Sequence, residues 1–208
     1  MNTETVTTTG TTTGTTTGTT TGTTTERHWT DPLQADICEA VLKDFQKFAT
    51  FADWWKGSHR SSSMLWVLEN IHYKNDRTLR LLACRFIREI CVDGTQTMWD
   101  MLTDDRSRLA VVVAERYANG QATKDQLHAA RRLAKMVIPL GDAAQAAIRI
   151  AGTEAMWVVR EVANDGACIA YDREHAKGEA AVKAEQADMI RSMIPLEEVA
   201  PLFEQRFS

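Results

Sequence analysis

Apolar side chains recur every three or four residues along nearly all of this chain after its first 26 positions, the pattern of amphipathic helices. One clear stripe is Leu79, Leu82 and Phe86, and no stretch alternates apolar and polar residues over the length of a strand. Because the loops between the stripes are short, neighbouring helices should be antiparallel. The pattern therefore predicts an all-α fold, either a single helical bundle or a short α-array of about 7–9 helices.

Start and stop signals divide the chain into segments. Pro32 suits the first position of a helix, Pro195 ends one, and Asn164–Gly166 could break or kink a long one. The predicted helices cover residues 32–48, 61–73, 76–92, 104–119, 124–138, 142–163 and 167–194, with short helical segments at 51–57, 98–102 and 196–205.

The clearest local signals lie between residues 102 and 123. Thr103 or Asp104 can cap a helix whose apolar face includes Leu109, and Gly120 supplies the left-handed residue that ends it. Thr123, followed three residues later by a glutamine, forms a capping box that starts the next helix. This region thus predicts two consecutive helices with a tight turn between them.

Residues 1–26 have a different pattern, threonine triplets separated by a glycine at every fourth position from Gly10 to Gly22. Such a segment has no large apolar side chains whose burial could offset the conformational entropy lost on ordering it. It predicts a disordered low-complexity tail, either without a role of its own or serving as a spacer or modified stalk. The helical domain is then expected to cover residues 27–208.

The chain has 24 Lys and Arg against 28 Asp and Glu, a net charge of −4. A mildly acidic chain lacks the basic surface that phosphate neutralisation requires, so no nucleic-acid partner is expected, although a local basic patch would escape this count. No apolar run reaches membrane-spanning length and no CxxC spacing occurs. Cys84 and Cys91, placed on one helix, are too far apart for a disulfide. We expect a cytoplasmic protein without a membrane partner.

Three segments, Leu79–Ile90 (LRLLACRFIREI), Met98–Thr123 and Ala181–Pro195, together resemble a family of uncharacterised helical proteins. That family is common in planctomycetes and some phages and carries the signature LTDERSR…AVEVAERYADGLAT. The matching signature positions here are Asp104, Arg106, Arg108, Glu115, Tyr117 and Gly120. The family is itself similar to helical immunity proteins of the toxin–antitoxin type. The resemblance implies a helical fold and a protein-binding role, and it brings no active site.

Asp104, Arg106 and Arg108 crowd one helix start. Their first interpretation is structural, because an acid caps the helix and Arg108 can pair with Asp104 one turn away. The alternative is that Arg106 and Arg108 contact a protein partner, since arginine is enriched at interfaces. Glu115 is expected to form an ion pair with Arg80, Arg85 or Arg88 rather than to act in catalysis.

Trp54 and Trp55 are adjacent, so on a helix the two rings point about 100° apart. They form either a satellite aromatic core or an exposed site for a protein partner. Asp172, His175 and Glu179 share one helical face and are weak candidates for metal ligands. Because no second ligand motif appears, a solvated charged face is the preferred interpretation, and we expect no metal, cofactor or catalytic residue.

The leading hypothesis is therefore a non-enzymatic factor that binds another protein. The narrower form, taken from the resemblance, is an immunity-like or phage or mobile-element accessory protein. One alternative is a metal-binding enzyme built in the helical bundle. The other is a self-assembling structural protein, in which Trp54 and Trp55 mediate a homo-oligomer.

Overall fold

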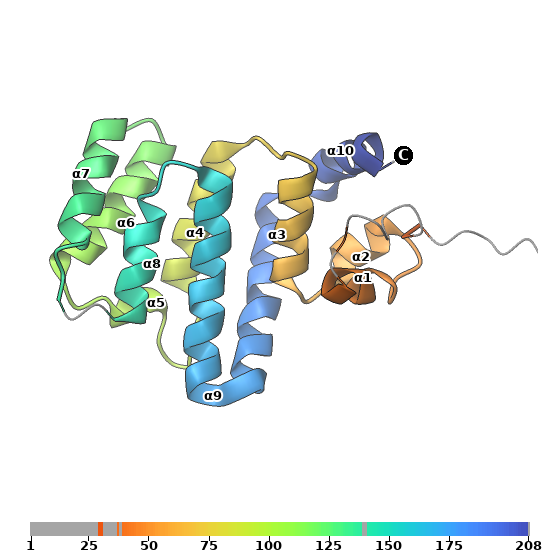
Figure 1. The fold of residues 1–208 in the computed structure, drawn as a ribbon, viewed down its shortest axis with the longest axis horizontal. Helices are drawn as coiled ribbons and strands as arrows, with labels where there is room; N and C mark the ends of the chain where they lie inside the picture. The colour runs from red at the N-terminus through yellow and green to blue at the C-terminus, as the bar shows by residue number, and fades with distance from the viewer. Residues whose placement is uncertain (1–28, 31–36, 38, 139–140, 208) are drawn as a thin grey trace, which may run out of the picture.

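The computed structural model describes residues 29–30, 37, 39–138 and 141–207, and within them it forms helices joined by short loops, with no extended strand (Figure 1). The predicted all-α fold is confirmed, while the predicted tail, residues 1–26, lies outside the described residues. The helices are α1 (Glu39–Phe45), α2 (Phe51–Gly57), α3 (Ser61–Asn70), α4 (Asp76–Glu89), α5 (Met98–Met101), α6 (Asp105–Ala118), α7 (Lys124–Ala134), α8 (Asp142–Ile150), α9 (Ala155–Met193) and α10 (Leu196–Phe207).

Helix α9 is a kinked helix whose two arms lie side by side in Figure 1. The kink is at His175, whose φ of 56° and ψ of −149° are not helical. Gly178 lies so close to the other arm that a Cβ atom on this residue would clash with the carbonyl oxygen of Ala170, at 2.6 Å. The predicted break at Asn164–Gly166 is wrong: the helix continues through these residues and turns back at His175.

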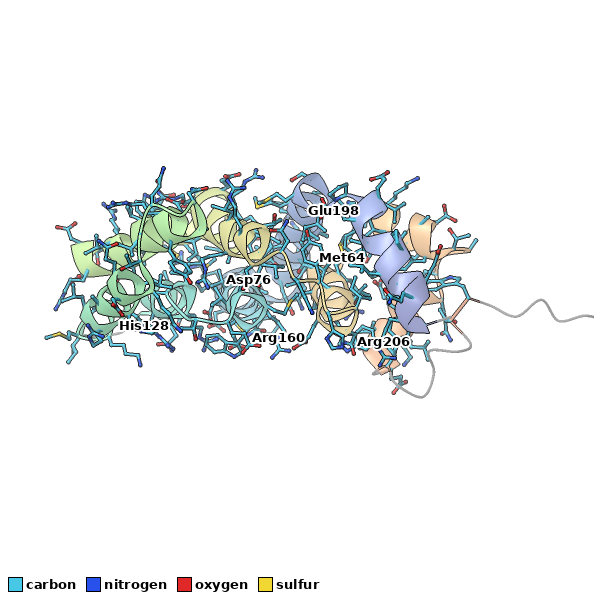
Figure 2. The ribbon with its side chains drawn as sticks, turned by 90° about the horizontal axis from the view of Figure 1, so that it is seen from above. Met64, Asp76, His128, Arg160, Glu198 and Arg206 are labelled. Atoms are coloured by element: carbon cyan, nitrogen blue, oxygen red, sulfur yellow. The ribbon has the colours of Figure 1, made fainter. Side chains whose placement is uncertain are left out.

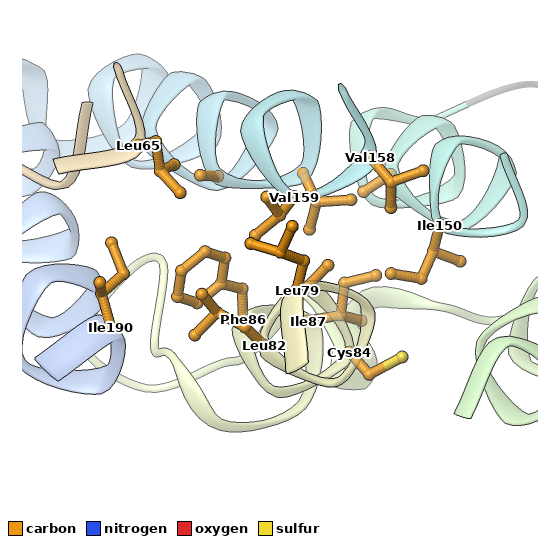
Figure 3. Close-up of a cluster of buried hydrophobic side chains, with 14 of the residues drawn as sticks. Leu65, Leu79, Leu82, Cys84, Phe86, Ile87, Ile150, Val158, Val159 and Ile190 are labelled. Carbon is orange, nitrogen blue, oxygen red and sulfur yellow. The ribbon is translucent and has the colours of Figure 1, made fainter. Parts of the chain in front are cut away.

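The core lies between α4, α3 and both arms of α9. Figure 3 shows Leu82 and Phe86 of α4 directed toward Val159 of the first arm and Ile190 of the second. These side chains are at most 1% exposed. The stripe of α4 that the sequence predicted as apolar is therefore the central buried surface of the molecule.

The segment predicted as one helix over residues 142–163 is two helices, because α8 ends at Ile150 and α9 begins at Ala155. Buried Arg80 of α4 holds the break by donating hydrogen bonds to the carbonyl oxygens of Ile150 (3.1 Å), Gly152 (2.8 Å) and Thr153 (3.1 Å). These carbonyls lie at a helix C-terminus, where a cation is favoured. Burial lowers the pKa of the Arg80 guanidinium, and the nearby Tyr117 side chain opposes that effect.

The molecule is elongated, with α6, α7 and α8 at one end and α1, α2 and α10 at the other (Figure 1). In Figure 2, seen from above, His128 of α7 lies at one end and Arg206 of α10 near the other. One continuous hydrophobic core nevertheless includes side chains from Ile37 to Phe203.

Two sequence expectations concern the cysteines and the membrane. Cys84 is buried in α4, but Cys91 lies beyond the end of that helix and is half-buried, so the prediction that they share one helix is wrong. In the part of the chain that the structure describes, every helix is too short or too polar to cross a membrane.

Candidate protein-binding face on α6 and α7

Helix α6 starts and ends within one residue of the prediction, and α7 starts at the predicted Lys124 but ends at Ala134 instead of residue 138. Asp104 is the N-cap of α6 and accepts a hydrogen bond from the backbone N–H of Arg106 at 2.8 Å. Thr123 and Gln126 form the predicted capping box of α7, with both reciprocal hydrogen bonds present. Gly120 has a φ of +71°, as the predicted left-handed turn requires. These local signals fix two adjacent helices that pack on each other.

A shallow cavity of about 200 Å³ lies between the outer surfaces of these two helices. We call it the α6–α7 groove, and its lining residues are Leu109, Val113, Arg116, Ala122, Gln126, Ala129, Ala130 and Leu133. The residues from each helix are three or four positions apart, so each helix contributes one face. The groove walls are mostly apolar and its two polar side chains are Arg116 and Gln126.

The groove is the centre of an exposed apolar surface. Of the five large hydrophobic side chains exposed among the described residues, four belong to this end of the molecule: Leu109 (43%), Leu133 (40%), Met136 (63%) and Ile138 (88%). Leu109 was expected to face the core, which is wrong, because α6 buries Ala110, Val111 and Ala114 instead. Grouped exposed apolar side chains mark interaction surfaces more often than scattered ones do.

Basic side chains also gather at this end of the molecule, although none of them lines the groove. His128, Arg131 and Arg132 of α7 and Lys135, its C-cap, lie together and are named here the basic row. Arg132 and Lys135 are exposed, and no ion pair is formed by either within the described part of the chain. Leu109 and Leu133, by contrast, come together only when α6 packs on α7.

The charge of this end differs in sign from that of the whole chain. Residues 105–138 contain seven Lys and Arg against three Asp and Glu, a net charge of +4. The chain as a whole has 24 against 28, so the remaining residues have 17 against 25, a net charge of −8. The α6–α7 groove therefore lies in the basic part of an acidic protein.

The predicted partner-binding arginines, Arg106 and Arg108, are half-buried in contacts within the molecule. Both guanidinium and backbone donors of Arg106 bind the Asp104 carboxylate, and they lower the pKa of that carboxyl to about 2. The expected pair between Arg108 and Asp104 is replaced by this one, and Arg108 lies 5.5 Å from the centroid of the Trp99 ring. The exposed cations of this face are instead Arg116, Arg132 and Lys135.

Glu115 forms the ion pair that the sequence left open between three arginines. Its carboxylate accepts two hydrogen bonds from the Arg88 guanidinium, the longer at 2.9 Å, and Arg88 stacks 3.9 Å from the centroid of Trp99. The signature residue Tyr117 lies under Arg80, 5.1 Å from ring centroid to guanidinium carbon. In this structure, Glu115 and Tyr117 therefore hold α6 against α4.

Trp54 and Trp55 are 0% and 2% exposed, so the prediction that they contact a partner is wrong. The Trp54 ring packs 4.4 Å from Phe45 between centroids, and its indole N–H donates to buried Asp44 at 2.9 Å. Both rings are buried because Phe51 and Phe203 cover this side of α2. They form an aromatic core, as the first interpretation expected, and it is part of the continuous hydrophobic core.

The weak metal candidates lie around the kink in α9. His175 has non-helical dihedral angles, so the helical face that was to join Asp172, His175 and Glu179 does not continue through it. Glu179 pairs with Lys183 on the same arm. Within the described residues no three His, Cys, Asp or Glu side chains are grouped as metal ligands would be.

The chemistry of the α6–α7 groove is that of binding. Its lining residues include neither a nucleophile nor a general base, while its apolar walls and cationic rim suit a ligand that is itself apolar and acidic. Comparisons of the chain with protein-family models, with curated proteins and with solved structures found no match.

Proposed function

We propose that this chain is a non-enzymatic factor that binds an acidic protein partner at the α6–α7 groove. The observation that carries the proposal is the exposure of Leu109 and Leu133 in an apolar groove whose polar lining includes the cationic Arg116. Charge complementarity selects the partner, because an apolar surface surrounded by cations excludes basic proteins and attracts acidic ones. The resemblance of residues 79–195 to a family similar to immunity proteins supports a narrower role as an immunity-like or mobile-element accessory protein.

Photocrosslinking in the cells that make this protein tests the proposal directly. A benzophenone amino acid replaces Leu133 in the groove, and a matched control carries it at exposed Lys56 of α2, at the other end of the molecule. We expect one discrete product between this chain and a different, acidic protein from position 133 and not from position 56. Products that contain only this chain, only lipid, or no partner at all would overturn the proposal.

A charge-reversal pair tests whether the basic row contributes. Arg132→Glu with Lys135→Glu should reduce the yield of the crosslinked product at least several-fold, whereas Lys56→Glu with Lys74→Glu, which changes the net charge equally, should leave it unchanged. Lys74 is exposed and lies outside α6 and α7. Equal loss in both variants would mean that total charge, not this face, determines binding.

A further inference from the structure

The shape of the α6–α7 groove indicates what kind of structure fits into it. Leu109, Val113 and Arg116 on α6, and Gln126, Ala129 and Leu133 on α7, are spaced three or four residues apart. Two adjacent helices with such faces leave a furrow between rows of side chains, into which the ridge of a third helix packs. An extended strand would need free backbone donors and acceptors, and those of α6 and α7 are used within the helices.

The floor of the groove is made of small side chains. Ala122, Ala129 and Ala130 line it, while Leu109 and Leu133 are the large side chains. Small residues allow a helix to approach closely, and the leucines can then interdigitate with apolar side chains of that helix. The groove-lining residues of α7 run from Gln126 to Leu133. At about 1.5 Å per residue they span roughly 10 Å, so the groove accommodates about two helical turns.

The charges near the groove indicate which charged side chains a bound helix should carry. Arg116 lines the groove on the α6 side, and Arg132 of the basic row, three residues after the groove residue Ala129, lies beyond its α7 edge. A bound helix would place one flank near Arg116 and the other toward Arg132, so Asp and Glu on its flanks would be favoured. Its inner face needs apolar residues at positions i, i+3 or i+4, and i+7.

We infer that the occupant of the α6–α7 groove is a single amphipathic helix of the partner that contacts it over about two turns, with apolar residues on one face and acidic residues on its flanks. This inference rests on the proposed function, because it specifies the part of the protein partner that binds. The groove is the receptor and the helix is the ligand, as in other helix-in-groove complexes.

Selection of peptides on the full-length protein tests the inference without knowledge of the natural partner. A library of side-chain-stapled 14-residue helices with randomised positions is selected on the wild-type chain and counter-selected on Ala129→Trp, which fills the groove floor. We expect enriched peptides to carry net negative charge and an apolar i, i+3 or i+4, i+7 pattern. No enrichment, or enrichment of basic helices, would overturn the inference.

Binding of one enriched peptide is then measured by fluorescence anisotropy. Leu133→Glu, and Arg132→Glu with Lys135→Glu, should each weaken its Kd about tenfold or more, and Lys56→Glu with Lys74→Glu should change it less than twofold. Leu133 is exposed, so Leu133→Glu should fold even if Ala129→Trp does not. Equal weakening by both charge-reversal pairs would overturn the assignment to this groove.

Two further probes separate the inference from other occupants and from the proposed function. The probes are vesicles of phosphatidylcholine with phosphatidylglycerol and a single-stranded oligonucleotide. If either probe binds with higher affinity and displaces the enriched peptide at physiological salt, the inference is overturned. If crosslinking from position 133 identifies an acidic partner that binds through a loop or a strand, the inference fails and the proposed function stands. If crosslinking finds no protein partner, the proposed function itself fails.

Discussion

The buried carboxylate of Asp165 should destabilise the protein at neutral pH, although it forms an ion pair with Arg149. The Asp165 side chain on the first arm of α9 is 11% exposed, and one carboxylate oxygen lies 3.1 Å from the Arg149 guanidinium. Its other oxygen is buried without a hydrogen-bond partner. Burial raises the pKa of Asp165 to about 6 from an ordinary 3.8; Arg149 opposes the shift, and Glu161 and Asp142 add to it.

The sign of the effect follows from linkage. A carboxyl with a raised pKa binds more protons in the folded state, so stability falls as pH rises from about 4 to about 6 and stays reduced above that. Each pKa unit corresponds to about 1.4 kcal/mol, so two units set an upper limit near 3 kcal/mol. Asp165→Asn removes this penalty, while Arg149 keeps its ion pair with Glu161 at 2.6 Å. We expect the free energy of unfolding at pH 8 to rise by about 1–3 kcal/mol.

Urea unfolding of the full-length chain at pH 4, 6 and 8 measures the effect. The gain from Asp165→Asn should be largest at pH 8 and shrink toward pH 4, where wild-type Asp165 is protonated in the folded state. Asp172→Asn, at an exposed position on the same arm of α9, is the matched control and should show little change. A variant that is less stable than wild type at pH 8, or whose stability difference is independent of pH, would refute the reasoning.

Three further substitutions test the packing of the core. Arg80→Lys should lower the free energy of unfolding by about 2–4 kcal/mol, because one ammonium group cannot reach three carbonyl oxygens. Gly178→Ala should cost about 1–3 kcal/mol, because its Cβ would clash with the backbone oxygen of Ala170. Trp54→Phe should cost about 1–3 kcal/mol by removing the hydrogen bond to the buried carboxylate of Asp44. Each is measured by urea unfolding at pH 7.

Each of these substitutions has a control in a less constrained place. Arg77→Lys changes the same residue type on the exposed side of α4, and Trp66→Phe changes a half-buried ring. Gly166→Ala meets only the flexible end of Met98 at 3.2 Å. If a control costs as much stability as its partner, the contact named for that partner is not the cause of the loss.

Helix ends with a side-chain cap were predictable because the cap is a short-range interaction. Thr123 bonds a residue three positions away, and Gly120 needs only its own backbone freedom. The end of α8 was not predictable, because Arg80, some 70 residues earlier, supplies its hydrogen bonds. Gly166 gave a false signal, since tertiary packing keeps it helical in contact with Met98.

The α6–α7 groove was only half visible in the sequence. Helical periodicity identified Leu109 as part of an apolar face, and that face was assigned to the core by default. Which apolar face becomes buried depends on which helix packs against it, and α7 covers α6 with alanines that leave Leu109 at 43% exposure. A sequence pattern shows that a face is apolar, but only the packing shows whether that face is buried within the molecule.

Net charge was a poor guide to the partner for a related reason. A total of −4 argued against a nucleic-acid partner, but a partner at the groove would be affected mainly by charges within about a Debye length, roughly 8 Å at physiological salt. α7 alone is about twice that length, so most of the acidic residues elsewhere are screened from its outer surface. The +4 of residues 105–138 is therefore the charge on which the proposal of an acidic protein partner rests.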